Sequence, residues 1–160
     1  ASDWSSDVCS SDLGHIQRGI ADGAVPLADG RSLRTSLGSY FVGPTILDHA
    51  NPDMSVACDE IFGPVLTVLR VKTLDEAIQL VNRSRFGNAS SIFTDSGSAS
   101  REYTSRVEAG MVGVNIGVAA PMAFFPFAGW KQSFFGDLHA HGKDAVSFYT
   151  EQKVIMSRWF

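Results

Sequence analysis

Residues 64–117 alternate between short apolar runs and segments of helical pattern, and this alternation restricts the fold more than any other feature. PVLTVLRV, at 64–71, is an apolar run of strand length with three valines. SSIFT, at 90–94, and MVGVNIG, at 111–117, are two further strand-like segments, each preceded by a helical one. The order strand, helix, strand, helix, strand is typical of an α/β layer with parallel pairing. The sequence therefore predicts an α/β fold.

The two helical segments carry their own start signals. In TLDEAIQLVNRSR, Thr73 is followed three residues later by Glu76, which is the spacing of a capping box. Its apolar residues recur at helical spacing and share one face: Leu74, Ala77, Ile78 and Val81. The second segment, 96–110, offers two serines as caps and a glycine just past its end: Ser96, Ser98 and Gly110.

The remaining elements have weaker signals. Leu13, Ile16 and Ile20 predict a helix over 13–24. In the first part of the chain the sequence also predicts a strand in 25–30, a polar connection over 31–39, extended segments on either side of Pro44 and one helical turn in 54–60. At the other end it predicts a helix over 141–149 and an alternating terminal strand, KVIMSRW. Nothing remains in the chain to pair with that strand, which favours pairing with another subunit.

The segment 119–136 has six aromatic residues between Phe124 and Phe135, with prolines and glycines among them. Such a segment cannot be a regular helix or strand throughout, so a packed loop is expected. Two interpretations stay open. The loop folds over its own core, or it forms a surface for another part of the molecule or for a substrate tunnel.

The first thirteen residues differ from the rest. ASDWSSDVCSSDL repeats SSD, is rich in Ser and Asp and has no periodicity, so it is expected to be disordered. It also resembles the read-through translation of a sequencing adapter. Residues 1–13, with Cys9, are therefore expected to be non-native.

Charge and composition exclude several classes of function. The net charge is -4 and the Lys and Arg residues are scattered, so nucleic acid is not an expected partner. No apolar run approaches the roughly 20 residues of a membrane helix, and no signal peptide is recognisable. The two cysteines, Cys9 and Cys58, lack CxxC spacing, which favours a reducing, cytoplasmic location.

Most candidate reactive residues can be set aside. His139 and His141 have the spacing of two ligands on one strand face, but no third ligand lies near them, so no metal site is predicted. The negative charges of Asp59 and Glu60 disfavour the thiolate of Cys58 and make it a weak nucleophile. No serine lies in a GxSxG motif. No catalytic residue is predicted in this chain.

Glu60 is the candidate that remains. A carboxylate accepts two hydrogen bonds at once, which suits the vicinal hydroxyls of a sugar. If the segment is extended, Phe62 lies on the same side and adds a flat apolar wall. Together the two side chains are suited to a ribose and an aromatic base. The alternative is that Glu60 caps a turn or pairs with a lysine.

Several motifs resemble the NAD-dependent aldehyde dehydrogenase family. DEIFGPVL, TLDEAIQLVNRSRFGNASSIFT, MVGVNIG and FAGWKQSFFGDLHAHGKDAVSFYTEQKV occur in the order found in the C-terminal part of that family. PMAFFPFAGWKQSFFGDLHAHG is most similar to the CoA-acylating methylmalonate-semialdehyde dehydrogenases, since most relatives carry a KxSGxGRE segment there.

The resemblance implies a fold and a set of roles. The fold is the second half of an aldehyde dehydrogenase-like catalytic domain, over 14–150, followed by an oligomerisation strand over 151–160. Glu60 hydrogen-bonds the ribose hydroxyls on the nicotinamide side of NAD, and Phe62 borders the nicotinamide. The dinucleotide-binding domain and the nucleophilic cysteine lie upstream in the family, so this chain alone is expected to be inactive.

The implied parent enzyme is a homo-oligomer that oxidises malonate or methylmalonate semialdehyde. It uses NAD and CoA and forms acetyl- or propionyl-CoA, CO₂ and NADH. Two alternatives remain: a non-catalytic assembly or binding module, and a part of an aldehyde dehydrogenase that hydrolyses its thioester with water.

Overall fold

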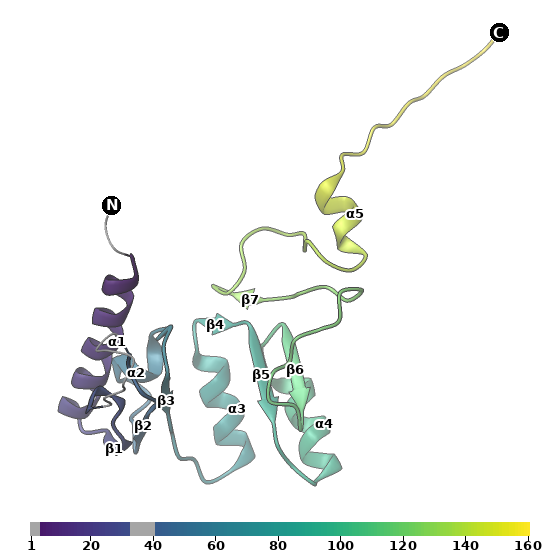
Figure 1. Cartoon of the computed structure of the whole chain (residues 1–160). Helices are drawn as coiled ribbons and strands as arrows, with labels where there is room; N and C mark the ends of the chain where they lie inside the picture. The colour runs from purple at the N-terminus through teal and green to yellow at the C-terminus, as the bar shows by residue number, and fades with distance from the viewer. Residues whose placement is uncertain (1–3, 33–40) are drawn as a thin grey trace. The chain divides into compact units, whose positions relative to one another are not determined.

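The computed structural model describes residues 4–32 and 41–160 (Figure 1). The chain divides into two compact units, Ala1–Lys72 and Thr73–Phe160. The first unit has one three-stranded sheet and the second has two strand pairs, and each unit has its own apolar core. The EIFGP turn, defined as residues 60–64, lies in the first unit. The aromatic loop, defined as residues 119–136, lies in the second.

The first unit is a three-stranded sheet with helices beside it. Its elements are α1 (Trp4–Ala21), β1 (Val25–Ala28), the 3-10 helix η1 (Gly30–Ser32), β2 (Thr45–Asp48), α2 (Ser55–Cys58) and β3 (Val65–Thr67). The central strand β2 pairs antiparallel with β1 and parallel with β3. The connection between the two parallel strands contains α2, as parallel pairing requires a crossover.

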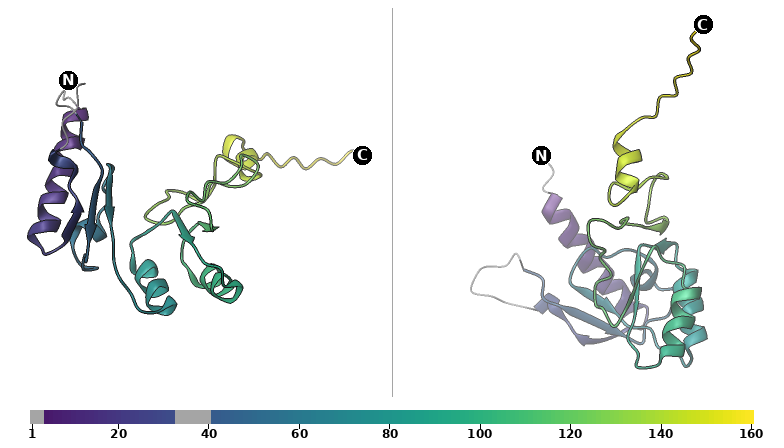
Figure 2. Two further views of the ribbon diagram at one scale, coloured as in Figure 1. Left: turned by 60° about the horizontal axis from the view of Figure 1, so that its bottom comes forward. Right: turned by 90° about the vertical axis from the view of Figure 1, so that its right-hand side faces the viewer.

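The core of the first unit lies between the sheet and α1 (Figure 2). It consists of buried Ala24, Leu47, Ala50 and Val56, with Leu47 fully buried. A Cβ on Gly19 would lie 2.7 Å from Cγ1 of Val56, so a glycine is what lets α1 approach α2 this closely. The apolar face read from the sequence of α1 is confirmed, because Ile16 is fully buried and Ile20 packs against this core.

The structure differs from the expectation at the start of the chain. The helix begins at Trp4, so residues 4–13 are helical where disorder was expected. Once the turns around Ile16 pack against the sheet, extending the helix adds one hydrogen bond per residue without a new nucleation cost. The non-native origin of residues 1–13 stays a prediction. Most of the expected polar connection lies outside the described residues, which omit 33–40.

The second unit is built on two parallel strands covered by two helices. Its elements are α3 (Leu74–Arg83), β4 (Phe86–Gly87), β5 (Ala89–Ile92), α4 (Gly97–Arg106), β6 (Met111–Val114), β7 (Trp130–Lys131) and α5 (Asp144–Tyr149). β5 pairs parallel with β6, and the short β4 pairs antiparallel with β7. Buried Ile78, Tyr103 and Val107 form the core between α3, α4 and the strand pair.

Both predicted helix caps are confirmed. The side chain of Thr73 accepts the backbone N–H of Glu76 at 3.1 Å, and α3 begins at the next residue. Ser96, the first of the two candidate serines, caps α4 by accepting the N–H of Ala99 at 3.3 Å. Each cap satisfies an N–H group that has no partner within its helix.

The sequence predicts one parallel layer from the three strands in 64–117. The α/β fold class is confirmed, but one of the three strands does not pair with the other two. The strand in 64–71 is β3, which is only three residues long and pairs with β2 of the first unit. The other two strands, β5 and β6, pair with each other as predicted. Periodicity along a sequence identifies strands, but it does not encode which strands become neighbours.

Candidate functional site

The EIFGP turn connects the end of α2 to the start of β3. Ile61 packs against the core of the first unit, whereas Glu60 and Phe62 are exposed, Phe62 to 80%. This alternation is that of an extended segment, in which successive side chains point to opposite sides. The structure therefore directs Glu60 and Phe62 away from the core, while the residue between them anchors the turn.

One backbone hydrogen bond and one steric contact hold the turn. The N–H of Thr45 donates to the carbonyl oxygen of Pro64 at 2.8 Å, which ties the turn to β2. A Cβ on Gly63 would lie 2.1 Å from Oδ2 of Asp12, so the turn passes directly against α1. Because Gly63 has no room for a side chain and Pro64 has a fixed φ, the segment has little freedom to move.

The carboxylate of Glu60 is available for a ligand. Within the described part of the chain it accepts no hydrogen bond and forms no ion pair. The alternative that Glu60 caps a turn or pairs with a lysine thus finds no support among residues 4–32 and 41–160. Two free oxygens beside an exposed aromatic ring form a surface that can accept paired hydroxyl donors next to a flat apolar group.

A buried aspartate at the carboxyl end of β2 forms an ion pair with an exposed arginine. Asp48 is 3% exposed, and its Oδ1 and Oδ2 accept Nε and an Nη of Arg70 at 3.0 and 2.5 Å. The backbone N–H of His49 donates to the same carboxylate at 2.8 Å. These hydrogen bonds, that of Arg70 foremost, hold the pKa of Asp48 below its ordinary value. Sequence reasoning missed this pair because its members lie in different segments and carry no motif.

The aromatic loop is anchored at its two ends. Before it, Asn115 adopts a left-handed φ of 56° and exchanges two hydrogen bonds with the backbone of Thr94, at 2.9 and 3.0 Å. Towards its end, Nζ of Lys131 donates to the carbonyl oxygens of Asn82 and Ser84 at 2.6 and 3.1 Å. These contacts fix the loop to the ends of β5 and α3.

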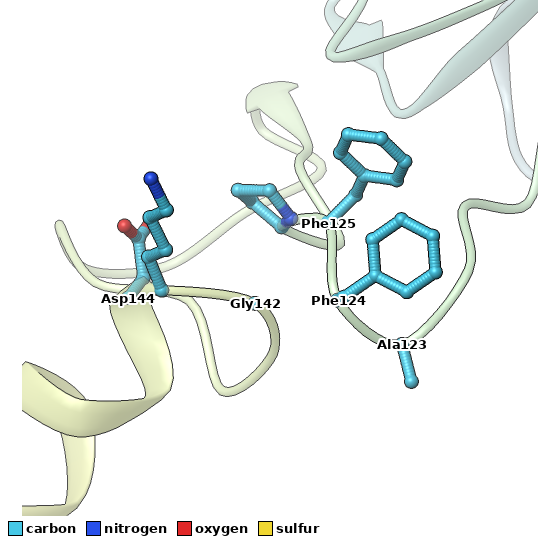
Figure 3. Close-up of a pocket in the computed structure, with 7 residues that line it drawn as sticks. Ala123, Phe124, Phe125, Gly142 and Asp144 are labelled. Carbon is cyan, nitrogen blue, oxygen red and sulfur yellow. The ribbon is translucent and has the colours of Figure 1, made fainter.

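Most aromatic side chains of the loop are exposed, and Phe134 is partly buried. The loop's large apolar residues with at least 45% exposure are Met122, Phe124, Phe125, Phe127, Trp130 and Phe135. An open hollow of about 700 Å³ lies where Phe124 and Phe125 approach the start of α5 (Figure 3). Of the two interpretations of the loop, a surface for another part of the molecule fits this exposure better than a loop over its own core.

The remaining candidates carry no reactive arrangement. Cys58 is exposed, and its Sγ lies 3.0 Å from the carbonyl oxygen of Pro52. His139 is bound to Asp144, and His141 contacts the ring of Phe127. The described residues contain no group of three metal-ligating side chains and no helix both long and apolar enough to cross a membrane.

An α/β chain with an exposed acid and phenylalanine in an EIFGP turn matches one large class of oxidoreductases. The chain belongs to the aldehyde dehydrogenase family, whose pattern matches residues 7–155. Its α/β fold is that of this family. The sequence-based recognition of the family is therefore confirmed.

The similar curated proteins share a narrower name. The chain is 55% identical over 148 residues to malonate-semialdehyde dehydrogenase 2 of Bacillus thuringiensis (strain Al Hakam). It is 52% identical over 147 residues to malonate-semialdehyde dehydrogenase 1 of Shouchella clausii (strain KSM-K16). Each match covers 92% of this chain and 30% of the relative, so the chain spans less than a third of the length of these proteins.

Similar solved structures carry a related name, methylmalonate-semialdehyde dehydrogenase. A protein from Sinorhizobium meliloti 1021 described as a methylmalonate-semialdehyde dehydrogenase, complexed with NAD, superposes with a TM-score of 0.91 at 40% identity. The methylmalonate-semialdehyde dehydrogenase of Oceanimonas doudoroffii gives 0.89 at 42% identity. Each covers 96% of this chain, which is 32% of the solved one.

Proposed function

We propose that this chain is the C-terminal part of an enzyme that oxidises malonate or methylmalonate semialdehyde with NAD and transfers the acyl group to CoA. The products are acetyl- or propionyl-CoA, CO₂ and NADH. The names of the similar curated and solved proteins support the substrate class, and the NAD complex of one of them supports the cofactor.

Glu60 is the residue that we assign to cofactor binding. Its two carboxylate oxygens accept the hydroxyl groups of the ribose on the nicotinamide side of NAD. The observation that carries this assignment is that Glu60 is exposed and has no partner in the described chain, although the backbone around it is firmly held. An acid kept free on a rigid turn is already prepared for a ligand, so little ordering free energy is lost on binding.

Phe62 is assigned to the border of the nicotinamide. Its ring is 80% exposed and follows Glu60 on the same side of the turn. When bound, NAD supplies the acceptor for the hydride of the aldehyde. Phe62 limits the positions that the acceptor ring can take and helps to exclude water. Placement matters because reaction requires the two reacting atoms to be held in contact and aligned.

The attacking thiolate is proposed to belong to the part of the enzyme outside this chain. We assign the catalytic role to no residue here, and in particular not to Cys58. The chain contributes the cofactor contacts, the aromatic loop near the substrate and the segment 151–160. That segment is exposed along its whole length, and we propose that it pairs with a neighbouring subunit of a cytoplasmic homo-oligomer.

Steady-state kinetics of the full-length enzyme test the assignment of Glu60. Glu60→Gln removes the charge and one acceptor oxygen without removing an internal contact. We expect roughly a 10- to 100-fold loss in kcat/KM for NAD, the range of one or two hydrogen bonds to a charged group. Asp95→Asn makes the same acid-to-amide change at an exposed site in the second unit and is the control. Equal kinetics for Glu60→Gln and wild type would refute the assignment.

CoA dependence tests the reaction class separately. The proposal predicts an acyl-CoA product and little turnover without CoA. Formation of the free acid at the same rate with and without CoA would favour the hydrolytic alternative. Because this readout concerns the fate of the thioester, it can fail while the cofactor assignment holds.

A further inference from the structure

Helix α5 is attached to the second unit without a buried core. None of its residues, Asp144–Tyr149, is buried, and the segment 151–160 that follows is exposed throughout. Hydrophobic burial, which fixes the positions of α3 and α4, therefore does not fix the position of α5. A small number of specific contacts near its first residue must do so.

His139 makes two of these contacts. Its Nδ1 lies 2.8 Å from Oδ2 of Asp144, the first residue of α5, and because a carboxylate only accepts, Nδ1 carries the proton and donates. The imidazole also stacks on the ring of Phe134, with centroids 4.4 Å apart and planes at 27°. The side chain of His139 is only 19% exposed. The imidazole of His139 thus joins the aromatic loop to the first residue of α5.

A backbone contact lies beside this imidazole. The N–H of Gly142 donates to the carbonyl oxygen of Ala123 at 3.1 Å. A Cβ on Gly142 would lie 2.7 Å from the carbonyl carbon of Phe125, so the two segments touch along their backbones. Figure 3 shows Gly142 and Asp144 on one side of the hollow and Phe124 and Phe125 on the other. Asp144 is therefore both a wall of the hollow and the partner of His139.

We infer that His139 is a positioning residue that holds α5, and with it the segment 151–160, against the aromatic loop. The link has a consequence that rests on the proposed function. If 151–160 pairs with a neighbouring subunit and the aromatic loop lies near the substrate, the His139–Asp144 contact couples subunit association to the shape of that loop. Loosening it changes both properties, because the same imidazole contacts the aromatic loop and the start of α5.

Hydrogen exchange of the 160-residue chain tests the contact without using activity. The amide of Gly142 reports whether the two segments stay together. We expect His139→Ala and Asp144→Ala each to accelerate its exchange about fivefold, as the loss of one partly buried hydrogen bond to a carboxylate allows. The double variant should exchange no faster than the faster single variant, because both changes remove the same contact.

Matched controls lie in the same segment. Asp137→Ala removes a second acid that no hydrogen bond joins to a histidine within the described residues, and it should change the exchange less than about twofold. His141→Ala removes a second imidazole, whose ring contacts Phe127, and measures how much that edge contact adds. Asp144→Asn and His139→Gln keep side-chain size and serve if an alanine variant unfolds. Unchanged exchange in all four variants at His139 and Asp144, or effects that multiply in the double variant, would overturn the inference.

The full-length enzyme separates the inference from the proposed function. His139→Ala should raise the KM for the aldehyde several-fold and lower kcat by a smaller factor. It should also shift the subunit equilibrium toward smaller species. If the exchange effect is present but neither kinetics nor assembly changes, the contact exists and the coupling does not. If no semialdehyde is turned over at all, the proposed function fails while the exchange result stands.

Discussion

Replacing Ile61 by alanine tests how the EIFGP turn is held. Ile61 is partly buried against the core formed by Ala24, Leu47, Ala50 and Val56. Truncating a fully buried isoleucine costs about 2–5 kcal/mol, so a residue buried to a lesser extent should cost roughly 1–2.5 kcal/mol. Phe62, its larger neighbour, is 80% exposed. Phe62→Ala should therefore cost at most about 0.5 kcal/mol of unfolding free energy.

Urea unfolding, followed by far-UV circular dichroism, measures both variants against wild type. The free energy of unfolding should fall for Ile61→Ala and stay nearly constant for Phe62→Ala. The effect on enzyme activity does not follow this order of stability. In the full-length enzyme Phe62→Ala should impair hydride transfer despite its stable fold. If Phe62→Ala destabilised the chain as much as Ile61→Ala, the turn would face the opposite way and the account of the site would be wrong.

Three further predictions concern other parts of the chain. Hydrogen bonds lower the pKa of Asp48 in the folded state below its ordinary value of 3.8. The contact of Asp48 with Arg70 therefore stabilises the fold above about pH 4, and this stabilisation is lost as the pH falls through the folded-state pKa. The free energy of unfolding, measured as a function of pH, should therefore differ between wild type and Arg70→Ala by less at low pH than near neutral pH. A difference that does not change with pH would contradict this. Thr73→Ala should cost about 1 kcal/mol in urea unfolding, and Thr73→Ser much less, because only the alanine removes the cap. Deleting 151–160 from the full-length enzyme should yield smaller species in size-exclusion chromatography, and an unchanged elution volume would argue against the pairing strand.

Local signals gave the elements that the structure confirms. Thr73 and Ser96 were identified as caps because their hydrogen bonds join residues three apart, so the sequence contains both partners of the contact. The exposure of Glu60 and Phe62 followed from alternation in an extended segment, which also depends only on neighbours. Predictions of this kind need no knowledge of the tertiary fold.

Features that depend on distant partners were not predictable. The pairing of β3 with β2, the contact of Asp48 with Arg70 and the contact of Gly63 with Asp12 all join separate segments. Such contacts form only once the chain has packed, and one sequence without relatives holds no record of them. The helical state of residues 4–13 was missed for the same reason, since composition describes a segment apart from the helix it extends.

A crystal structure of the full-length enzyme with NAD is the most direct test of whether the Glu60 carboxylate binds the cofactor. We predict both carboxylate oxygens at about 2.5–3.0 Å from the two hydroxyls of the nicotinamide-side ribose, with the ring of Phe62 beside the nicotinamide. A bound NAD whose ribose hydroxyls contact other groups, with Glu60 still turned to solvent, would contradict the account.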